Sequence, residues 1–237
     1  MKTILVTGAS QGIGLEFARQ YLIRGCQVIA ASRQAIKSDR LNTLKAQYGE
    51  LMVIETLDIS EAVSREDFFN RIGEKVSKID LLINNAGIIS GNEEYTYQFG
   101  ELDQEDLCRT LLVNSVAPLM MVEAAYPLLK NGTNPVVVNI TSDNGSISRR
   151  NQGGKYGYCT SKAGLNMITK ILSYDLKADR MIVVCLHPGW VKTPMTRNEP
   201  APLEADESIA GMIAVIDSLE LTDSGKFLDW RGEQIDW

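Results

Sequence analysis

Short apolar runs alternate along the chain with amphipathic stretches in which apolar positions recur every three or four residues. Continuous runs rich in Val, Ile and Leu are typical of parallel strands that are buried on both faces. The alternation therefore predicts repeated βαβ units around one parallel sheet. Strands are expected at Thr3–Thr7, Gln27–Ala31, Leu51–Leu57, Leu81–Asn84, Pro135–Thr141 and Met181–His187, with a seventh near Lys226–Leu228.

The amphipathic stretches between these runs predict helices that cover both faces of the sheet. No internal repeat, low-complexity tract or Pro/Gly-rich linker divides the sequence. We therefore expect residues 1–237 to form a single α/β domain, a doubly wound Rossmann fold with a parallel sheet of about seven strands. The helices are expected at Ile13–Arg24, Arg40–Tyr48, Arg65–Ser77, Gln104–Leu129, Tyr156–Lys177 and Glu204–Ser218.

Three stretches do not fit this alternation. Ile88–Gly100 and Asp143–Lys155 are predicted to be loops. Thr193–Pro202 contains three prolines and precedes a predicted helix. It is equally typical of a mobile lid over a substrate and of a plain surface connection.

The composition excludes several classes of partner. Hydrophobic residues make up 44% of the 237 residues, enough for one large core, and the net charge is -6. An acidic protein has no general basic surface for nucleic acid or anionic lipid. The apolar run at the N-terminus is too short for a secretory signal, and we expect no later stretch long enough to span a membrane. These features predict a cytoplasmic protein.

The cysteines and the single histidine exclude two kinds of chemistry. The four cysteines lie far apart and form no CxxC pair, so we expect reduced thiols in or near the core. His187 is the only histidine and directly precedes Pro188. A zinc site or a serine–histidine triad would have to be built around this one imidazole, so no metal site is predicted.

A glycine-rich segment follows the first predicted strand and opens the first predicted helix. Glycines in this setting let backbone N–H groups approach a pyrophosphate at a helix N-terminus. The spacing is GxxxGxG, one residue longer before the second glycine than the common dinucleotide fingerprint. The alternative is a glycine-rich turn without a ligand. The candidate cofactor contacts in this segment are Gly8, Ser10, Gln11, Gly12, Ile13 and Gly14.

The ends of the next strands add further candidates. The second strand is followed by Ser32 and Arg33 with no acidic residue, which favours the 2′-phosphate of NADP(H) over the free ribose of NAD. Asp58, followed by Ile59, can accept a hydrogen bond from an adenine amino group, and it is equally compatible with a helix cap or a turn. Asn85-Ala86-Gly87 suits a tight turn beneath a nicotinamide ribose or a purely structural turn.

Tyr158 and Lys162 are four residues apart in a predicted helix, so both side chains project from one face. A phenol must lower its pKa by about 3 units, or about 4 kcal/mol, to exchange protons near neutral pH. An ammonium about 4 Å away supplies roughly that energy at an effective dielectric constant of about 20. The pair predicts an acid/base centre, although an isolated YxxxK is common on exposed helices.

Several short segments and single residues recur in a familiar order along the chain: TGASQGIG, NNAG, Asn114, Ser142, YCTSK and His187-Pro188-Gly189. The sequence resembles the short-chain dehydrogenase/reductase family, in which these features occur in the same order. The match spans nearly the whole chain. The segment HPGWVKTPM and the end SGKFLDWRGEQIDW also look similar to the C-factor and sniffer-like carbonyl reductase branch of the family.

The resemblance implies a role for each matching residue. Ser142 would orient and polarise the substrate carbonyl, and Tyr158 would donate or accept the proton. Lys162 would lower the pKa of Tyr158 and bond the nicotinamide ribose. Asn114 would interrupt its long helix so that a water can link Lys162 to solvent. Ser142 and Asn114 are also compatible with a strand-end turn and with a kink or packing role, respectively.

The segment after the sixth strand would contact the carboxamide and the pyrophosphate of the cofactor. The candidates there are Pro188, Gly189, Val191 and Thr193. One departure from the family pattern is Asp143, which follows the serine where small or hydroxyl residues are more usual. The loop from there to Tyr158 is slightly longer than typical, and its polar groups suit a polar or anionic carbonyl substrate or simply solvent. These groups are Asp143, Asn144, Arg149, Arg150 and Lys155.

The sequence thus predicts hydride transfer between NADP(H) and a small carbonyl compound or secondary alcohol. One alternative is a non-catalytic dinucleotide-binding signalling or sensor protein. Another is an epimerase or dehydratase of nucleotide sugars, for which 237 residues leave little room. Two of the predicted helices carry more apolar positions than are needed to cover the sheet. We expect these positions to join the chains of a homodimer or homotetramer, and the alternative is that they belong to the core. They are Leu111, Leu112, Met120, Met121, Met167, Ile168 and Leu172.

Overall fold

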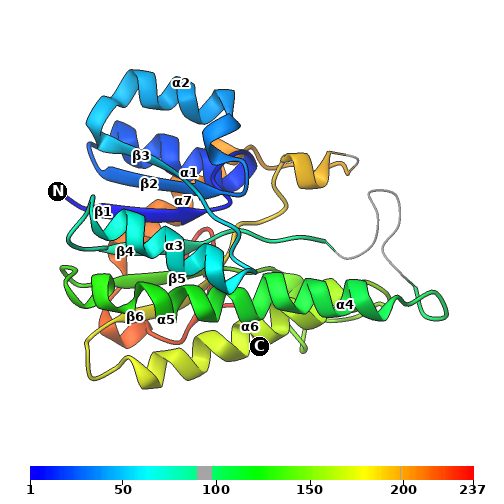
Figure 1. Cartoon of the computed structure of the whole chain (residues 1–237). Helices are drawn as coiled ribbons and strands as arrows, with labels where there is room; N and C mark the ends of the chain where they lie inside the picture. Colours follow the sequence, from blue (N-terminus) through cyan, green and yellow to red (C-terminus); the bar gives the residue numbers. More distant parts are fainter. Residues whose placement is uncertain (90–97, 198) are drawn as a thin grey trace.

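The protein is described by a computed structural model that covers residues 1–89, 98–197 and 199–237. Seven strands of the described chain form one parallel sheet in the order β3-β2-β1-β4-β5-β6-β7 (Figure 1). This confirms the predicted doubly wound Rossmann fold. The strand order reverses between β1 and β4, and ligands bind beyond the carboxyl ends of strands at such a point. The strands are β1 (Thr3–Thr7), β2 (Gln27–Ser32), β3 (Met52–Thr56), β4 (Leu81–Asn84), β5 (Val136–Ile140), β6 (Ile182–His187) and β7 (Phe227–Asp229).

Helices cover both faces of the sheet, and each strand supplies side chains to both layers. Ile4 and Val6 of β1 pack toward α1, α2 and α7, whereas Leu5 between them packs toward α3, α5 and α6 (Figure 1). This alternation is what a strand buried on both faces requires. The helices are α1 (Gly12–Ile23), α2 (Asp39–Tyr48), α3 (Ala62–Gly73), α4 (Gln104–Leu111), α5 (Ala117–Lys130), α6 (Tyr156–Asp175) and α7 (Ala205–Ser218).

Helices α4 and α5 are joined by a π-helical turn at Leu112–Val116, which contains Asn114. Together they form one long helix, as the sequence predicts. By length and composition Gln104–Lys130 is the one helix of the described residues that could cross a membrane, with a mean hydropathy of 1.4 in its most apolar window. The expectation that no such stretch exists is therefore wrong. Its apolar character has a structural reason, because the inner face of α5 lies in the core against the sheet.

Several expected boundaries and positions differ from the structure. α3 begins at Ala62 rather than Arg65 and ends at Gly73 rather than Ser77. Of the four cysteines only Cys185 is fully buried, and Cys108 is exposed, so the expected core location is wrong for Cys108. Most of the predicted loop Ile88–Gly100 lies outside the described residues.

Candidate active site

The glycine loop between β1 and α1 has backbone positions that only glycine can occupy. Gly8 has a φ of +65°, and a Cβ built there would lie 2.9 Å from the Cα of Ala86. A Cβ on Gly14 would lie 2.5 Å from the carbonyl oxygen of Gly8. Gln11 caps α1, and the first N–H groups of a helix have no partner within the helix. The first turn of α1 therefore offers a set of N–H donors to an anion.

The turn Asn85–Gly87 braces this loop from the end of β4. The Thr7 hydroxyl accepts hydrogen bonds from the backbone N–H groups of Asn85 and Ala86, at 3.0 and 3.1 Å. The Asn85 amide donates to the carbonyl oxygens of Thr7 and Gly8, at 2.9 and 3.3 Å. The asparagine thus holds the shape of the glycine loop, which favours the structural interpretation of this residue.

The residues predicted to bind the adenosine end lie at the carboxyl ends of β2 and β3. The buried Ser32 hydroxyl has no hydrogen-bond partner among the described residues, and Arg33 beside it is exposed. Asp58 uses Oδ1 to accept hydrogen bonds from the backbone N–H and the hydroxyl of Ser60, at 3.0 and 2.6 Å. One carboxylate oxygen of Asp58 therefore stabilises a turn, and Ile59 after it is buried.

The segment after β6 lies against the glycine loop. A Cβ on Gly12 would meet the Cβ of Thr193 at 3.5 Å, so the two segments border the same space. Val191 is buried and pairs with Leu203 in a short β-bridge, and Gly189 has a φ of +82°. Within the stretch predicted to be a lid, Pro194–Thr196 forms a 3-10 turn, and Asn198 lies outside the described residues.

The four predicted catalytic residues converge at the carboxyl ends of β4 and β5. Lys162 is buried in α6 and donates from Nζ to the carbonyl oxygen of Ile140, at 2.9 Å. Asn114 exchanges two hydrogen bonds of 2.8 Å with the backbone of Ile88 and donates to the Ser161 hydroxyl at 3.0 Å. The π-turn therefore fastens α4 both to the chain after β4 and to α6, the helix that carries the Tyr–Lys pair.

Gly87 lies between these groups. A Cβ at Gly87 would stand 3.2 Å from Asn114 Oδ1 and 3.7 Å from Lys162 Nζ. A side chain there would crowd the ammonium group, so the residue type matters for the reaction centre as well as for the turn.

The electrostatics of the Tyr–Lys pair differ from the sequence prediction. Burial raises the pKa of Tyr158 to about 12, although a hydrogen bond with Ser142 lowers it, and the carboxylates of Asp143 and Glu199 raise it further. Burial also lowers the pKa of Lys162 to about 8. Lys162 Nζ lies 5.8 Å from the centre of the phenol ring. The expected lowering of the Tyr158 pKa by Lys162 is therefore not seen in this arrangement.

Ser142 is surrounded by polar groups that the sequence does not place there. Its hydroxyl donates to Asp143 Oδ1 at 3.1 Å and accepts from the backbone N–H of Asn144 at 3.1 Å. The Nδ1 atom of His187, at the end of β6, accepts from the backbone N–H of Asp143 at 3.3 Å. The Arg150 guanidinium donates hydrogen bonds to the carbonyl oxygens of Gly153 and Gly154, so it binds groups within its own loop.

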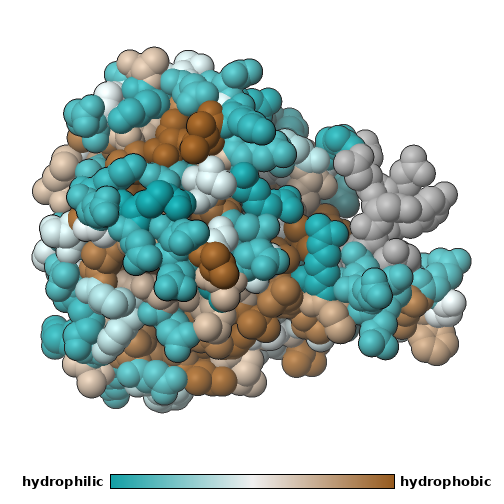
Figure 2. All heavy atoms as spheres, in the orientation of Figure 1, coloured by the Kyte–Doolittle hydropathy of each residue, from teal (hydrophilic) through white to brown (hydrophobic). Residues whose placement is uncertain are grey.

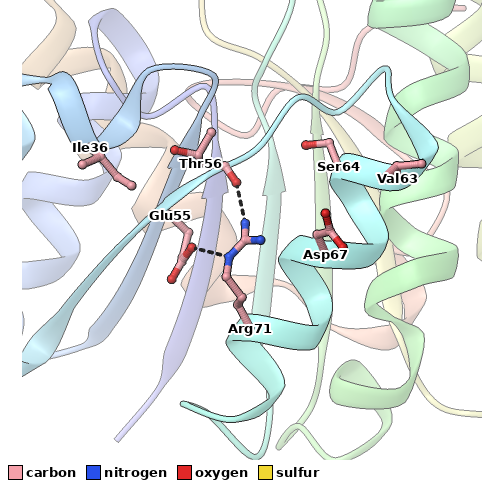
Figure 3. Close-up of a pocket in the computed structure, with 7 residues that line it drawn as sticks. All are labelled: Ile36, Glu55, Thr56, Val63, Ser64, Asp67 and Arg71. Atoms are coloured by element: carbon pink, nitrogen blue, oxygen red, sulfur yellow. Dashed lines mark hydrogen bonds and ion pairs between the residues drawn. The ribbon is translucent and has the colours of Figure 1, made fainter.

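A separate groove of about 630 Å³ lies beside the edge strand β3, away from the reaction centre (Figure 3). Arg71 of α3 spans it and donates to Glu55 Oε2 at 2.9 Å and to the carbonyl oxygen of Thr56 at 3.0 Å. These bonds cover part of the strand edge. The groove contains none of the predicted catalytic residues.

The comparisons with known proteins fit this geometry. The family model described as short chain dehydrogenase matches residues 2–204. The chain belongs to the short-chain dehydrogenase family. C-signal of Myxococcus xanthus is 40% identical over 159 residues, which cover 67% of this chain and 93% of that protein. The 1-hydroxy-2-glutathionyl-2-methyl-3-butene dehydrogenase of Rhodococcus sp. (strain AD45) is 32% identical over the full length of both.

Solved structures of family members superpose closely. An NADPH-bound carbonyl reductase from chicken fatty liver is 33% identical, with a TM-score of 0.90 over 100% of this chain and 99% of that chain. The carbonyl reductase Sniffer of D. melanogaster is 29% identical, with a TM-score of 0.92 over both full chains. Close structural neighbours of this chain are thus NADP(H)-bound carbonyl reductases, which confirms the resemblance to that branch of the short-chain dehydrogenases.

Proposed function

We propose that the protein is an NADP(H)-dependent carbonyl reductase that interconverts a small carbonyl compound and a secondary alcohol. The observation that supports this most is the convergence of Ser142, Tyr158 and Lys162 next to the glycine loop, with Ser142 hydrogen-bonded to Tyr158. The carbonyl reductase from chicken fatty liver is bound to NADPH, and a similar carbonyl reductase from Pseudomonas aeruginosa PAO1 is in complex with NADP. The net charge of -6 and the family assignment support a small-molecule substrate, and we propose that the protein acts in the cytoplasm.

The residues of this chain fit a bound dinucleotide. Gly8 and Gly14 leave no room for a Cβ because they pack against Ala86, Asn85 and the Gly8 carbonyl group, which is the tight turn and close helix packing of a dinucleotide-binding loop. The buried Ser32 hydroxyl has no partner among the described residues, and it stands beside the exposed Arg33. Ser32 and Arg33 would hold the 2′-phosphate, and the first turn of α1 would hold the pyrophosphate.

A bound nicotinamide ring supplies or accepts the hydride. Tyr158, which stays protonated at neutral pH, donates its proton to the carbonyl oxygen during reduction and takes it back during oxidation. Ser142 donates a hydrogen bond to the same oxygen and stabilises its developing charge. Lys162, charged at pH 7 with a pKa of about 8, adds positive charge beside the phenol. Asn114 keeps α4 attached to the helix that carries Tyr158 and Lys162.

The decisive experiment follows NADPH consumption with a panel of ketones, aldehydes and quinones. Tyr158→Phe should bind NADPH as the wild type does in a fluorescence titration, while turnover falls by at least about two orders of magnitude. Tyr156→Phe is the matched control, because Tyr156 is an exposed tyrosine on the same helix. Near-normal turnover of Tyr158→Phe would contradict the assignment.

The likeness to C-signal supports one alternative, a dinucleotide-binding signalling protein without turnover. A wild type that binds NADPH but reduces no member of the panel would favour that alternative. The four candidate catalytic residues favour the enzyme.

The protein also presents an apolar surface over α5 and α6 that suits a second copy of the chain (Figure 2). Met167, Ile171 and Tyr174 are exposed on α6, and Leu112 and Val116 are exposed on the π-turn. We propose a homo-oligomer through this surface. Met121 and Leu172, which the sequence places among the contact candidates, are buried in the core instead, because they face the sheet.

A further inference from the structure

The hydroxyl of Ser142 contacts groups of its own loop in addition to Tyr158. It accepts hydrogen bonds from the backbone N–H and from Nδ2 of Asn144, at 3.1 and 3.3 Å, and donates to Asp143 Oδ1 at 3.1 Å. A serine hydroxyl has two lone pairs and only one proton. Asp143 and the reacting oxygen of a substrate therefore compete for the same proton.

Asn144 is oriented so that it cannot donate elsewhere. Arg150 donates to Asn144 Oδ1 at 3.2 Å, which fixes the side-chain oxygen on the far side. The NH₂ group then points to Ser142 and to Asp143 Oδ1, the latter at 3.3 Å. Because Arg150 is committed to this contact and to loop carbonyl oxygens, it forms no ion pair with Asp143 in the described structure.

The carboxylate of Asp143 forms no ion pair with a lysine or arginine of the described residues. Its side chain is 50% exposed, and its one ion-pair neighbour among the described residues is His187, whose Nε2 lies 3.9 Å from Oδ1. Burial lowers the pKa of His187, so the imidazole is neutral at pH 7. Arg149 lies near enough to His187 to lower that pKa as well.

A second carboxylate faces the site from another element. Glu199, after β6, accepts a hydrogen bond of 2.8 Å from Trp190 Nε1. It raises the pKa of Tyr158, as Asp143 does, but has no hydrogen bond with Ser142. The two carboxylates differ in that only Asp143 contacts the serine.

We propose that Asp143 determines substrate class, selecting carbonyl compounds that carry a hydrogen-bond donor, a hydroxyl or a protonated amine, one or two carbons from the carbonyl. This inference rests on the proposed carbonyl reductase function. The substrate's donor takes the place of the Ser142 proton at Asp143 Oδ1. The serine proton then turns to the carbonyl oxygen and polarises it.

The distances suit this arrangement. Asp143 Oδ1 and Ser142 Oγ are 3.1 Å apart. Hydrogen bonds of about 3 Å to each leave a substrate donor at most about 9 Å from the carbonyl oxygen, a range that includes α and β substituents. A ketone without a donor leaves the serine proton on the carboxylate, and an anionic substrate is repelled by Asp143. The polar loop in the sequence leaves an anionic carbonyl substrate open, and this inference excludes such a substrate.

The test compares 2-hydroxyacetophenone with propiophenone, in which a methyl group replaces the hydroxyl. For the wild type we expect kcat/KM with NADPH to favour the hydroxy ketone by about ten- to hundredfold. The isosteric variant Asp143→Asn should lower this ratio by about tenfold and raise kcat/KM for propiophenone. Comparing the ratio between enzymes cancels the intrinsic difference in reactivity between the two ketones.

Glu199→Gln is the matched control, because it removes a carboxylate near Tyr158 that does not contact Ser142. Both variants should lower the pH at which oxidation of the alcohol reaches half its maximal kcat, since each carboxylate raises the pKa of Tyr158. Only Asp143→Asn should change the substrate preference.

The outcomes separate this inference from the proposed function. An unchanged preference in Asp143→Asn overturns the role of Asp143, and so does an equal loss of preference in Glu199→Gln. Reduction of neither ketone by a wild type that reduces other carbonyl compounds also overturns it. A wild type that reduces no carbonyl compound overturns the proposed function itself.

Discussion

Lys162 Nζ lies 5.8 Å from the centre of the Tyr158 ring, although the two side chains stand one turn apart on the same face of α6. The ammonium donates instead to the carbonyl oxygen of Ile140, at the end of β5. This bond anchors α6 to the sheet at the reaction centre. It also holds a positive charge in a buried position, where its pKa falls to about 8.

The buried ammonium predicts a pH dependence of stability. The pKa of Lys162 is lower in the folded protein than the ordinary 10.5, so the unfolded chain binds more protons between about pH 8 and 10.5. The free energy of unfolding of the wild type should therefore rise with pH in this window, relative to Lys162→Met, on the order of 1 kcal/mol per pH unit. Urea unfolding of both proteins at pH 7.5 and 9.5 measures this.

Lys177→Met, which removes an exposed lysine, is the control for the loss of one positive charge. A difference between wild type and Lys162→Met that stays constant over the two pH values would contradict a lowered pKa. Burial raises the pKa of Cys185 to about 12, and loss of Lys162 would raise it further, so this thiol stays protonated in all three folded proteins at both pH values.

The glycine loop gives a second prediction, about packing. Gly14→Ala should destabilise the protein by about 1–3 kcal/mol and weaken NADPH binding, because the added Cβ would lie 2.5 Å from both the Gly8 oxygen and Asn85 Nδ2. Gly73→Ala is the matched control, since nothing lies within 4 Å of its Cβ position in α3. That variant should retain wild-type binding and gain up to about 1 kcal/mol. Equal effects of the two substitutions would contradict the packing argument.

The sequence could predict the sheet and most of the helices, because local pattern alone specifies them. The runs Ile4–Val6 of β1 and Leu81–Ile83 of β4 are wholly apolar, as a strand buried on both faces requires. The four catalytic candidates could be placed because each sits at an element end or on one helical face. Their meeting at one edge then follows from the parallel sheet.

The surroundings of Ser142 could not be predicted in this way. Asp143 and His187 are 44 residues apart, and they meet because β5 and β6 are neighbours in register, with Ile140 opposite Leu186. The direction and the burial of each side chain then decide which polar groups contact Ser142. Periodicity likewise could not distinguish Met121, which faces the core, from the exposed Met167.

The apolar surface of α6 yields a prediction about assembly. Ile171 is 51% exposed and lies one turn after the exposed Met167, so the two form one patch. Ile171→Lys should convert a homo-oligomer into a smaller species at micromolar concentration, as measured by light scattering. Val63→Lys is the control, because Val63 is an exposed apolar residue on α3. A wild type that is monomeric at this concentration would refute the interface.

The last prediction concerns the choice between NADPH and NADH. Arg33 follows β2 directly, is exposed, and forms no hydrogen bond or ion pair in the described structure, so its guanidinium is available to a ligand. The unpartnered Ser32 hydroxyl lies beside it. Gln11 in the glycine loop carries no charge, so Arg33 is the main cationic candidate for contact with the 2′-phosphate.

Charge-assisted hydrogen bonds to a phosphate contribute about 1.5–3 kcal/mol, or about ten- to hundredfold in affinity. The wild type should therefore prefer NADPH to NADH by at least about tenfold in kcat/KM. Arg33→Asp should remove or reverse this preference, because a carboxylate repels the 2′-phosphate and accepts from a free ribose hydroxyl. Arg180→Asp changes the net charge equally, but it lies before β6, at the opposite end of the sheet. A wild type that prefers NADH, or an equal effect of the two variants, would show that Arg33 does not select the cofactor.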